Sequence, residues 1–235
     1  MALSPITQLP VKWENVFVDI QPTSLFGMDH DIAMIHTTML LRAAEAEQVV
    51  FALPAIDTPE SAPILRVFGK TAGTAAEFKE TTFDHVEEEL REAFAQAPRG
   101  DMDLFNEMKA EVENISLARI RIEPGDQLVR LDYAQHVPQL EDGAFEFRII
   151  APLASLLLNP VDVEIAFAVA LPWAPGRTLQ VVAAHSENPP GTPATPLSQR
   201  TTIAQRKYVG SLLRRDPVYS VEYRYGQKGP LVASG

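Results

Sequence analysis

Alternation of apolar and polar residues, the pattern of a strand with one buried face, recurs along most of this chain. β-branched and aromatic residues concentrate in these runs, which are bounded by Gly, Pro or Asn. Short strands at this spacing are typical of an antiparallel β-sandwich or barrel, and we predict a mainly β fold of the sandwich type. Residues 43–47, rich in Ala and Glu, also suit a helix, so this segment is open to either structure. The predicted strands are 16–20, 31–41, 48–54, 64–68, 118–122, 127–133, 144–150, 161–171, 178–182 and 218–225.

The period of the apolar pattern changes to that of a helix in the middle of the chain. Asp84 can cap a first helix, and Asp101 or Asp103 can cap a second helix after the break at 97–100. The sequence therefore predicts a two-helix hairpin, at about 84–114, inserted into the sandwich. The apolar positions at helical spacing are Phe83, Val86, Leu90 and Phe94, then Leu104, Phe105, Met108, Val112 and Ile115.

A proline-rich segment separates two parts of different charge. Residues 188–198 contain four prolines and no aromatic side chain, so we expect an extended linker that follows a sandwich domain at 1–187. Between 200 and 228 there are seven basic and two acidic residues, in a chain of net charge −11. We predict that 199–235 is a basic C-terminal arm. Its strand packs on the same or a neighbouring subunit, where the acidic hairpin complements its charge.

Composition excludes several classes of protein. The net charge of −11 and the pI of about 4.9 disfavour general attraction to nucleic acid or to anionic membranes. The absence of cysteine excludes disulfides, thiolate nucleophiles and cysteine-bound zinc. The N-terminus does not resemble a signal peptide, and no apolar run reaches the ~20 residues of a spanning helix. We therefore expect a cytoplasmic protein without membrane insertion. Because glycine-rich phosphate loops and a serine-hydrolase elbow are also absent, we expect no cofactor and favour a protein that is not an enzyme.

One cluster has the composition of a metal site. His30, Asp31 and His36 combine imidazole and carboxylate groups, which bind divalent metals. On a straight strand the backbones of His30 and His36 lie ~20 Å apart, so a shared ion requires a sharp bend. A polar turn beside Gly27 explains the same residues without a ligand.

The basic arm mixes cationic and aromatic side chains in the way of a surface that binds another macromolecule. We predict as interaction residues Arg206, Lys207, Arg214, Arg215 and Tyr223. Trp13 and Trp173 are expected as core or interface anchors.

Two short motifs carry a resemblance to a known family. The segment Val-Val-Phe-Ala-Leu-Pro at 49–54 ends in a Leu-Pro step, and 123–133 places a Pro-Gly turn before a strand that ends in Tyr. In these pieces the chain resembles the VIT-like (vault protein inter-alpha-trypsin) β-sandwich. The resemblance covers about half of the chain, and the helical hairpin and proline-rich segment depart from it. It implies an interaction module without a catalytic centre.

These observations lead to three functional hypotheses. The first is a non-enzymatic structural or protein-interaction module that self-assembles as a homo-oligomer or binds another protein. The alternative is a small-ligand or metal-binding sandwich, a hydrolase included, whose pocket uses His30, Asp31, His36 or His136. The third is nucleic-acid binding through the C-terminal arm, which the negative charge of the remainder of the chain opposes.

Overall fold

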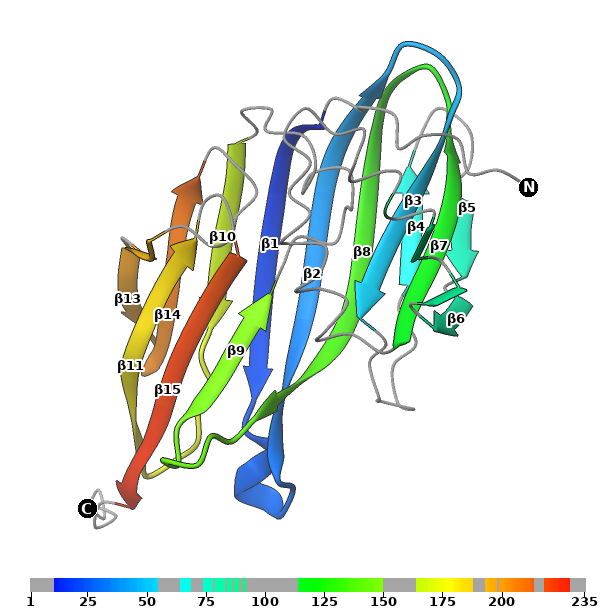
Figure 1. Ribbon diagram of the computed structural model, residues 1–235. Helices are drawn as coiled ribbons and strands as arrows, with labels where there is room; N and C mark the ends of the chain where they lie inside the picture. The colour runs from blue at the N-terminus through cyan, green and yellow to red at the C-terminus, as the bar shows by residue number, and fades with distance from the viewer. Residues whose placement is uncertain are drawn as a thin grey trace.

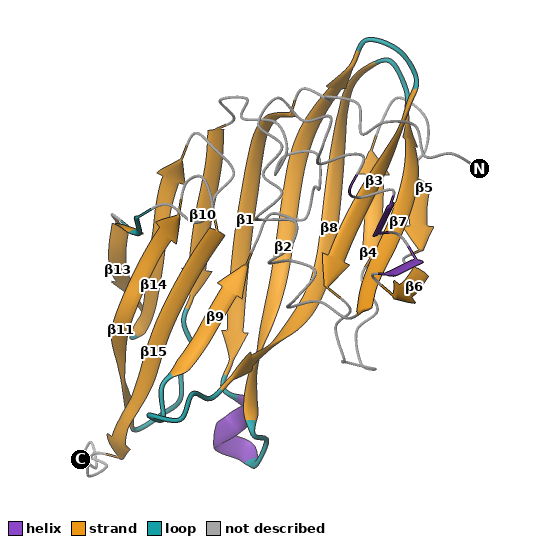
Figure 2. Cartoon of the chain, in the orientation of Figure 1, coloured by secondary structure: helices purple, strands orange, loops and turns teal. Residues whose placement is uncertain are grey.

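The computed structural model of the chain is built from strands arranged in two layers (Figure 1). It describes residues 11–54, 64–68, 74–77, 79–82, 84–85, 87–88, 91, 114–149, 164–187, 193–197, 199–213 and 218–228. One layer is an eight-stranded sheet, and the other holds a four-stranded and a three-stranded sheet side by side. The predicted mainly β fold is confirmed, and strands dominate the view by secondary structure (Figure 2).

The eight-stranded sheet has the order β13-β14-β10-β1-β2-β8-β4-β5. Its neighbours are antiparallel except for β1 and β10, which are parallel, so the expected purely antiparallel sheet is wrong at this pair. Its strands are β1 (Val11–Gln21), β2 (His30–Ala43), β4 (Ile64–Phe68), β5 (Thr74–Glu77), β8 (Gly125–Pro138), β10 (Glu164–Ala170), β13 (Gln199–Ile203) and β14 (Arg206–Leu213).

Two smaller sheets form the second layer. The four-stranded sheet has the order β12-β11-β15-β9, and the three-stranded sheet has the order β3-β7-β6. The hairpins β2-β3 and β7-β8 turn over at the same end of the molecule and carry the chain between the layers (Figure 1). The strands are β3 (Glu47–Pro54), β6 (Lys79–Thr82), β7 (Asn114–Ile122), β9 (Phe145–Ile149), β11 (Arg177–Glu187), β12 (Thr195–Pro196) and β15 (Val218–Lys228).

Apolar side chains from all three sheets meet in one core between the layers. Alternate residues of β2, among them Ile35, Met39 and Leu41, are completely buried, as a strand with one core face requires. Across the layers, the rings of Phe167 in β10 and Tyr219 in β15 stack at 3.7 Å between centroids. Truncating one such large side chain costs ~2–5 kcal/mol, so this contact helps to fix how the layers face each other.

The predicted two-helix hairpin is wrong. The named elements of the described residues are strands and one 3-10 turn, Thr23–Phe26, called η1. Ile115, expected in the second helix, lies in β7 and pairs with Pro54 of β3. Pairing of β7 on both sides, with β3 and β6, outweighs the helical spacing of its apolar residues. Residues 92–113 lie outside the described part of the chain, and the described residues just before them with helical backbone are Asp84, His85, Glu87, Glu88 and Arg91.

The basic C-terminal segment is built into both layers. β14 pairs with β10 in the large sheet, and β15 lies between β11 and β9 in the small one. Within the expected linker, β12 pairs with β11, and the Leu197 amide donates a hydrogen bond to the Ala184 carbonyl. This chain's own sandwich therefore contains the strands of 199–228. In the described part of the chain, no helix has the length and apolar character needed to span a membrane.

Candidate functional site

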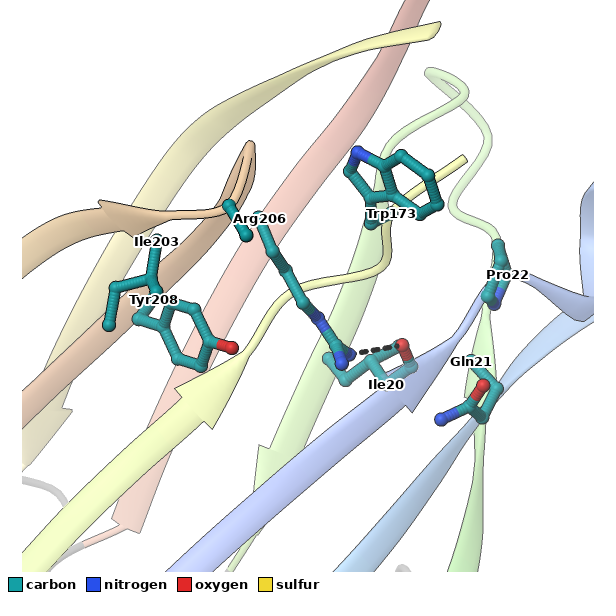
Figure 3. A pocket seen from close by; sticks show the side chains of 8 residues that line it. Ile20, Gln21, Pro22, Trp173, Ile203, Arg206 and Tyr208 are labelled. Carbon is teal, nitrogen blue, oxygen red and sulfur yellow. Dashed lines mark hydrogen bonds between the residues drawn. The ribbon is translucent and has the colours of Figure 1, made fainter. Parts of the chain in front are cut away.

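A pocket of about 330 Å³ opens at the end of the sandwich where β1 and β10 end and the β13-β14 hairpin turns (Figure 3). It combines two aromatic side chains with apolar groups and few polar ones. Such a composition is common in binding sites for small molecules, which use a few polar groups to orient a ligand. The lining residues are Ile20, Gln21, Pro22, Trp173, Ile203, Ala204, Arg206 and Tyr208.

A tight turn places one wall of this pocket. Ala204 and Gln205 connect β13 to β14 and both have positive φ, 48° and 67°. This is the conformation of a two-residue hairpin turn whose twist matches the strands. Neither residue is Gly or Asn, so the turn stores backbone strain of ~1–3 kcal/mol per residue. The turn sets Ile203 opposite Arg206 at the tip, and both side chains line the pocket.

Arg206 ties the surrounding strands together. Its Nε donates to the Leu171 carbonyl at 2.7 Å, and its Nη2 donates to the carbonyls of Ile20 and Ala170, each at 3.1 Å. Nη2 also forms an ion pair with Asp19, next to the end of β1. Figure 3 shows the side chain crossing the middle of the pocket toward Ile20. Because Asp19 balances its charge, the pocket has no uncompensated charge among its lining residues.

Several groups in the pocket are available to a ligand. Trp173 is 44% exposed and Ile203 is 59% exposed, large values for such apolar side chains. Neither the Trp173 indole N–H nor the Tyr208 hydroxyl has a hydrogen-bond partner in the described structure. Gln21 donates its amide to Asp19 at 2.8 Å, which leaves its carbonyl oxygen as an acceptor. Two aromatic faces, two donors and one acceptor therefore surround a charge-balanced space.

The three residues predicted as metal ligands do not share a site. Asp31 is completely buried on the inner face of β2, whereas His30 and His36 lie on the outer face. Asp31 accepts hydrogen bonds from the Ser24 amide and hydroxyl, at 2.9 and 2.6 Å, and from the hydroxyls of Tyr223 and Tyr225, at 2.6 and 2.7 Å. Among the described residues, no group of three or more His, Cys, Asp or Glu is placed to hold a metal ion.

The histidines pair locally instead. His30 stacks on His136 of β8 at 3.8 Å between ring centroids, and its Nδ1 lies 2.6 Å from Asp29. The hydrogen bond with His30 lowers the pKa of the exposed Asp29 carboxyl. His36 lies farther along β2 and contacts Asp132 at 2.6 Å. Burial raises the pKa of Asp132, but hydrogen bonds from Arg130 and His36 outweigh it, so the net pKa is lowered.

The predicted interaction residues are scattered. Arg206 lines the pocket, and Lys207 points to the opposite side of the same hairpin, where it donates to the Leu179 carbonyl. Tyr223 is completely buried in the core, where Asp31 accepts its hydrogen bond. Arg214 and Arg215 lie outside the described residues.

Sequence reasoning missed the pocket itself. Trp173 was expected as a core or interface anchor, and Gln21 and Ile203 were not considered as binding residues. One signal was present, because Trp173 is flanked by Pro172 and Pro175, which predicts a rigid surface loop. Nothing in the sequence pairs that loop with a hairpin some 30 residues away.

Another carboxyl is buried at the far end of β1. Glu14 is completely buried on the inner face, and neither carboxyl oxygen has a hydrogen-bond partner. Burial raises the pKa of Glu14 to about 8. Burial, and to a smaller extent the charge of Glu14, also raises the pKa of the Tyr133 hydroxyl. On the adjacent strand the buried Thr37 hydroxyl also has no partner. Glu14 is therefore mostly protonated at pH 7.

Comparison with known proteins adds a fold likeness. No family model and no curated protein matches the chain. Its fold is similar to a solved structure of a "putative nutrient binding protein" from Legionella pneumophila, with a TM-score of 0.57 and 14% sequence identity. The similarity covers 94% of this chain and 68% of that one. At this identity the match concerns the fold alone. It neither supports nor excludes the VIT-like resemblance, which stays a prediction.

Proposed function

We propose that this protein is a small-ligand-binding β-sandwich whose Trp173 pocket takes a neutral, polar ring, such as one sugar unit. The observation that carries the proposal is the exposed Trp173 indole in a charge-balanced pocket that it shares with Tyr208. A pyranose has an apolar face of C–H groups and a rim of hydroxyls. The face suits an aromatic ring, and the rim suits isolated donors and acceptors.

The dimensions and charge of the pocket narrow the ligand class. A volume of about 330 Å³ is at the small end of ligand pockets and suits a single ring or the end of a chain. The ion pair of Arg206 with Asp19 removes the main reason for an anion to bind. The hydroxyl of Tyr208, the indole N–H of Trp173 and the carbonyl of Gln21 supply the polar partners. The name of the structural neighbour, a nutrient-binding protein, agrees with small-ligand binding.

The chain offers a matched experiment because it contains two tryptophans. In W13F, Trp173 is the sole tryptophan, so its fluorescence reports on the pocket. We expect neutral mono- and disaccharides to shift this emission and to bind W13F and wild type equally by calorimetry. W173A should weaken binding by about tenfold or more, because stacking and apolar burial are lost together. Equal affinity for W173A and wild type, or no saturable binding of any neutral sugar, would overturn the proposal.

Self-association as a homo-oligomer and a cytoplasmic location remain predictions from the sequence. Sedimentation of the full chain over a range of concentrations tests the first. A single monomer mass at every concentration would contradict it.

A further inference from the structure

We infer a second binding site, for the carboxylate or phosphate group of a small anion, in the cleft between β11 and the β13-β14 hairpin. The cleft has a volume of about 760 Å³. Tyr208 borders both this cleft and the Trp173 pocket, and Trp173 itself does not line the cleft. Residues that line it include Thr178, Leu179, Arg200, Thr202, Lys207 and Gly226. This site does not depend on the function proposed for the pocket.

The strand register brings the two cations of this cleft together. Arg200 of β13 pairs with Val209 of β14, and Thr202 pairs with Lys207. Val209 is buried in the core, so this face of the hairpin is the one that points toward the opposite layer. Arg200 and Lys207 are diagonal neighbours on that face, ~7–8 Å apart in an antiparallel pair. At this separation two long side chains can reach the oxygens of one anion.

Both cations have N–H donors available for a ligand. Lys207 donates to the Leu179 carbonyl across the cleft, which holds its ammonium group in place and leaves two of its three N–H bonds. Arg200 is exposed and has no carboxylate or hydrogen-bond partner in the described structure. Other arginines differ: Arg42 is paired with Asp126, and Arg206 with Asp19. An unpaired guanidinium is suited to bidentate binding of an oxyanion.

The charge of the cleft contrasts with that of the chain. Among its lining residues there are two cations and no Asp or Glu, although the chain has a net charge of −11. The local positive charge favours a small anion, whereas the charge of the whole molecule repels a long polyanion such as nucleic acid. The threonine side chains supply hydroxyls that can bind the remaining polar atoms of such a ligand.

The cleft is open because most of β11 has no described neighbouring strand on this side of its sheet. β12 pairs with His185 and Ser186, and Leu197 binds the Ala184 carbonyl, so no described strand covers β11 on that side from Arg177 to Ala183. Gly226 of β15 also keeps space at the cleft. A Cβ placed there would lie 2.1 Å from the Thr178 hydroxyl oxygen, so a larger residue would displace that hydroxyl.

The test uses inorganic phosphate and glucuronate as probes, with neutral glucose as a third ligand, in calorimetry at low ionic strength. We expect at least one anion to bind wild type and R200Q to bind it about tenfold more weakly. R121Q is the matched control, because Arg121 is an exposed arginine of β7 in the other small sheet. This variant should bind as wild type does. A preference for phosphate or for glucuronate identifies the anionic group.

The two sites can be distinguished by the same variants. W173A should leave anion binding unchanged, and R200Q should leave neutral-sugar binding unchanged. T202V provides a second probe of the cleft if R200Q folds poorly, with a smaller loss of affinity. Equal anion affinity in wild type, R200Q and T202V would overturn the inference, as would the absence of saturable binding by both anions.

Discussion

Two carboxyl groups, Asp31 and Glu14, are completely buried between the layers of this sandwich but differ in their hydrogen bonding. They lie on neighbouring strands, β2 and β1, toward opposite ends of the molecule. Asp31 accepts four hydrogen bonds, whereas Glu14 accepts none. The cost of burying a carboxyl therefore depends on the donors that meet it, and burial alone does not determine it.

This difference in hydrogen bonding bears on function, because the partners of Asp31 lie in elements that adjoin the Trp173 pocket. The donors to Asp31 come from η1 and from β15, so this residue joins β2, the adjoining turn and the opposite layer. Gln21 and Pro22, directly before that turn, form one wall of the Trp173 pocket. Glu14 joins nothing by hydrogen bonds. We therefore expect Asp31 to stabilise both the fold and the pocket, and Glu14 to lower stability at neutral pH.

Removing Asp31 should have the largest effect. D31A leaves the buried Tyr223 hydroxyl and the partly buried donors of Ser24 and Tyr225 without their acceptor, which costs ~3–5 kcal/mol of unfolding free energy. Urea unfolding measures this loss, and sugar binding should weaken as the pocket wall loosens. D29A is the control. Asp29 is exposed, so its removal should change stability by no more than ~0.5 kcal/mol. Equal stabilities for the two variants would contradict the role given to Asp31.

Substitution of Glu14 should change the unfolding free energy in the opposite direction, towards greater stability. Its pKa is raised from 4.5 to about 8, so between these pH values the unfolded chain releases a proton that the folded chain retains. The folded state consequently loses stability as the pH rises from 4.5 to 8, by ~3 kcal/mol at pH 7. E14Q removes this ionisation, so it should be more stable than wild type.

The pH dependence makes this prediction specific. The stability difference between E14Q and wild type should be close to zero near pH 4, should grow with pH and should level off above pH 8. Urea unfolding at a series of pH values tests it. A difference that stays constant with pH would show that Glu14 titrates normally in the folded state.

The contrast between these two residues was only partly accessible from the sequence. Alternation predicted the strand at 31–41, but Ile32 and Met34 are apolar as well as Ala33 and Ile35. The pattern therefore did not tell which face is buried, and Asp31 was placed with His30 on a metal site. Its partner Tyr223 lies 192 residues away, and only the packing of the two layers brings them together.

The residues in the turns explain why some parts of the structure were predictable from the sequence and others were not. The Pro124-Gly125 turn at the start of β8 was recognisable from its residues. In the structure Gly125 has a positive φ, which glycine adopts without strain. The turn at Ala204 and Gln205 adopts positive φ without Gly or Asn, so no residue signalled the β13-β14 hairpin. Both the Trp173 pocket and the basic cleft depend on that hairpin. The elements built on common turn residues were therefore predictable, and the sites were not.

The tyrosines that bind Asp31 allow a finer test. Y223F removes a hydroxyl that donates to Asp31 in the core, while Asp31 keeps its other three donors. We expect a loss of ~1–2 kcal/mol in unfolding free energy, since a buried hydrogen bond is lost while the acceptor keeps its other partners. Y225F should cost less, because Tyr225 is only partly buried. Loss of as much stability in Y223F as in D31A would mean that this one hydrogen bond accounts for the whole effect of Asp31.

The smallest expected effect concerns Thr37, the uncharged counterpart of Glu14. Its buried hydroxyl has no hydrogen-bond partner, and Val16 lies opposite it on β1, so Glu14 is its diagonal neighbour across the strands. T37V keeps the shape of the side chain and removes the unsatisfied hydroxyl, which should raise stability by ~0.5–1 kcal/mol. If the two groups are independent, the gains of T37V and E14Q should add within ~0.5 kcal/mol in the double variant. A larger coupling would show that the Thr37 hydroxyl interacts with the Glu14 carboxyl and reduces the cost of burying it. Glu14 would then resemble Asp31 in having a polar neighbour that stabilises it.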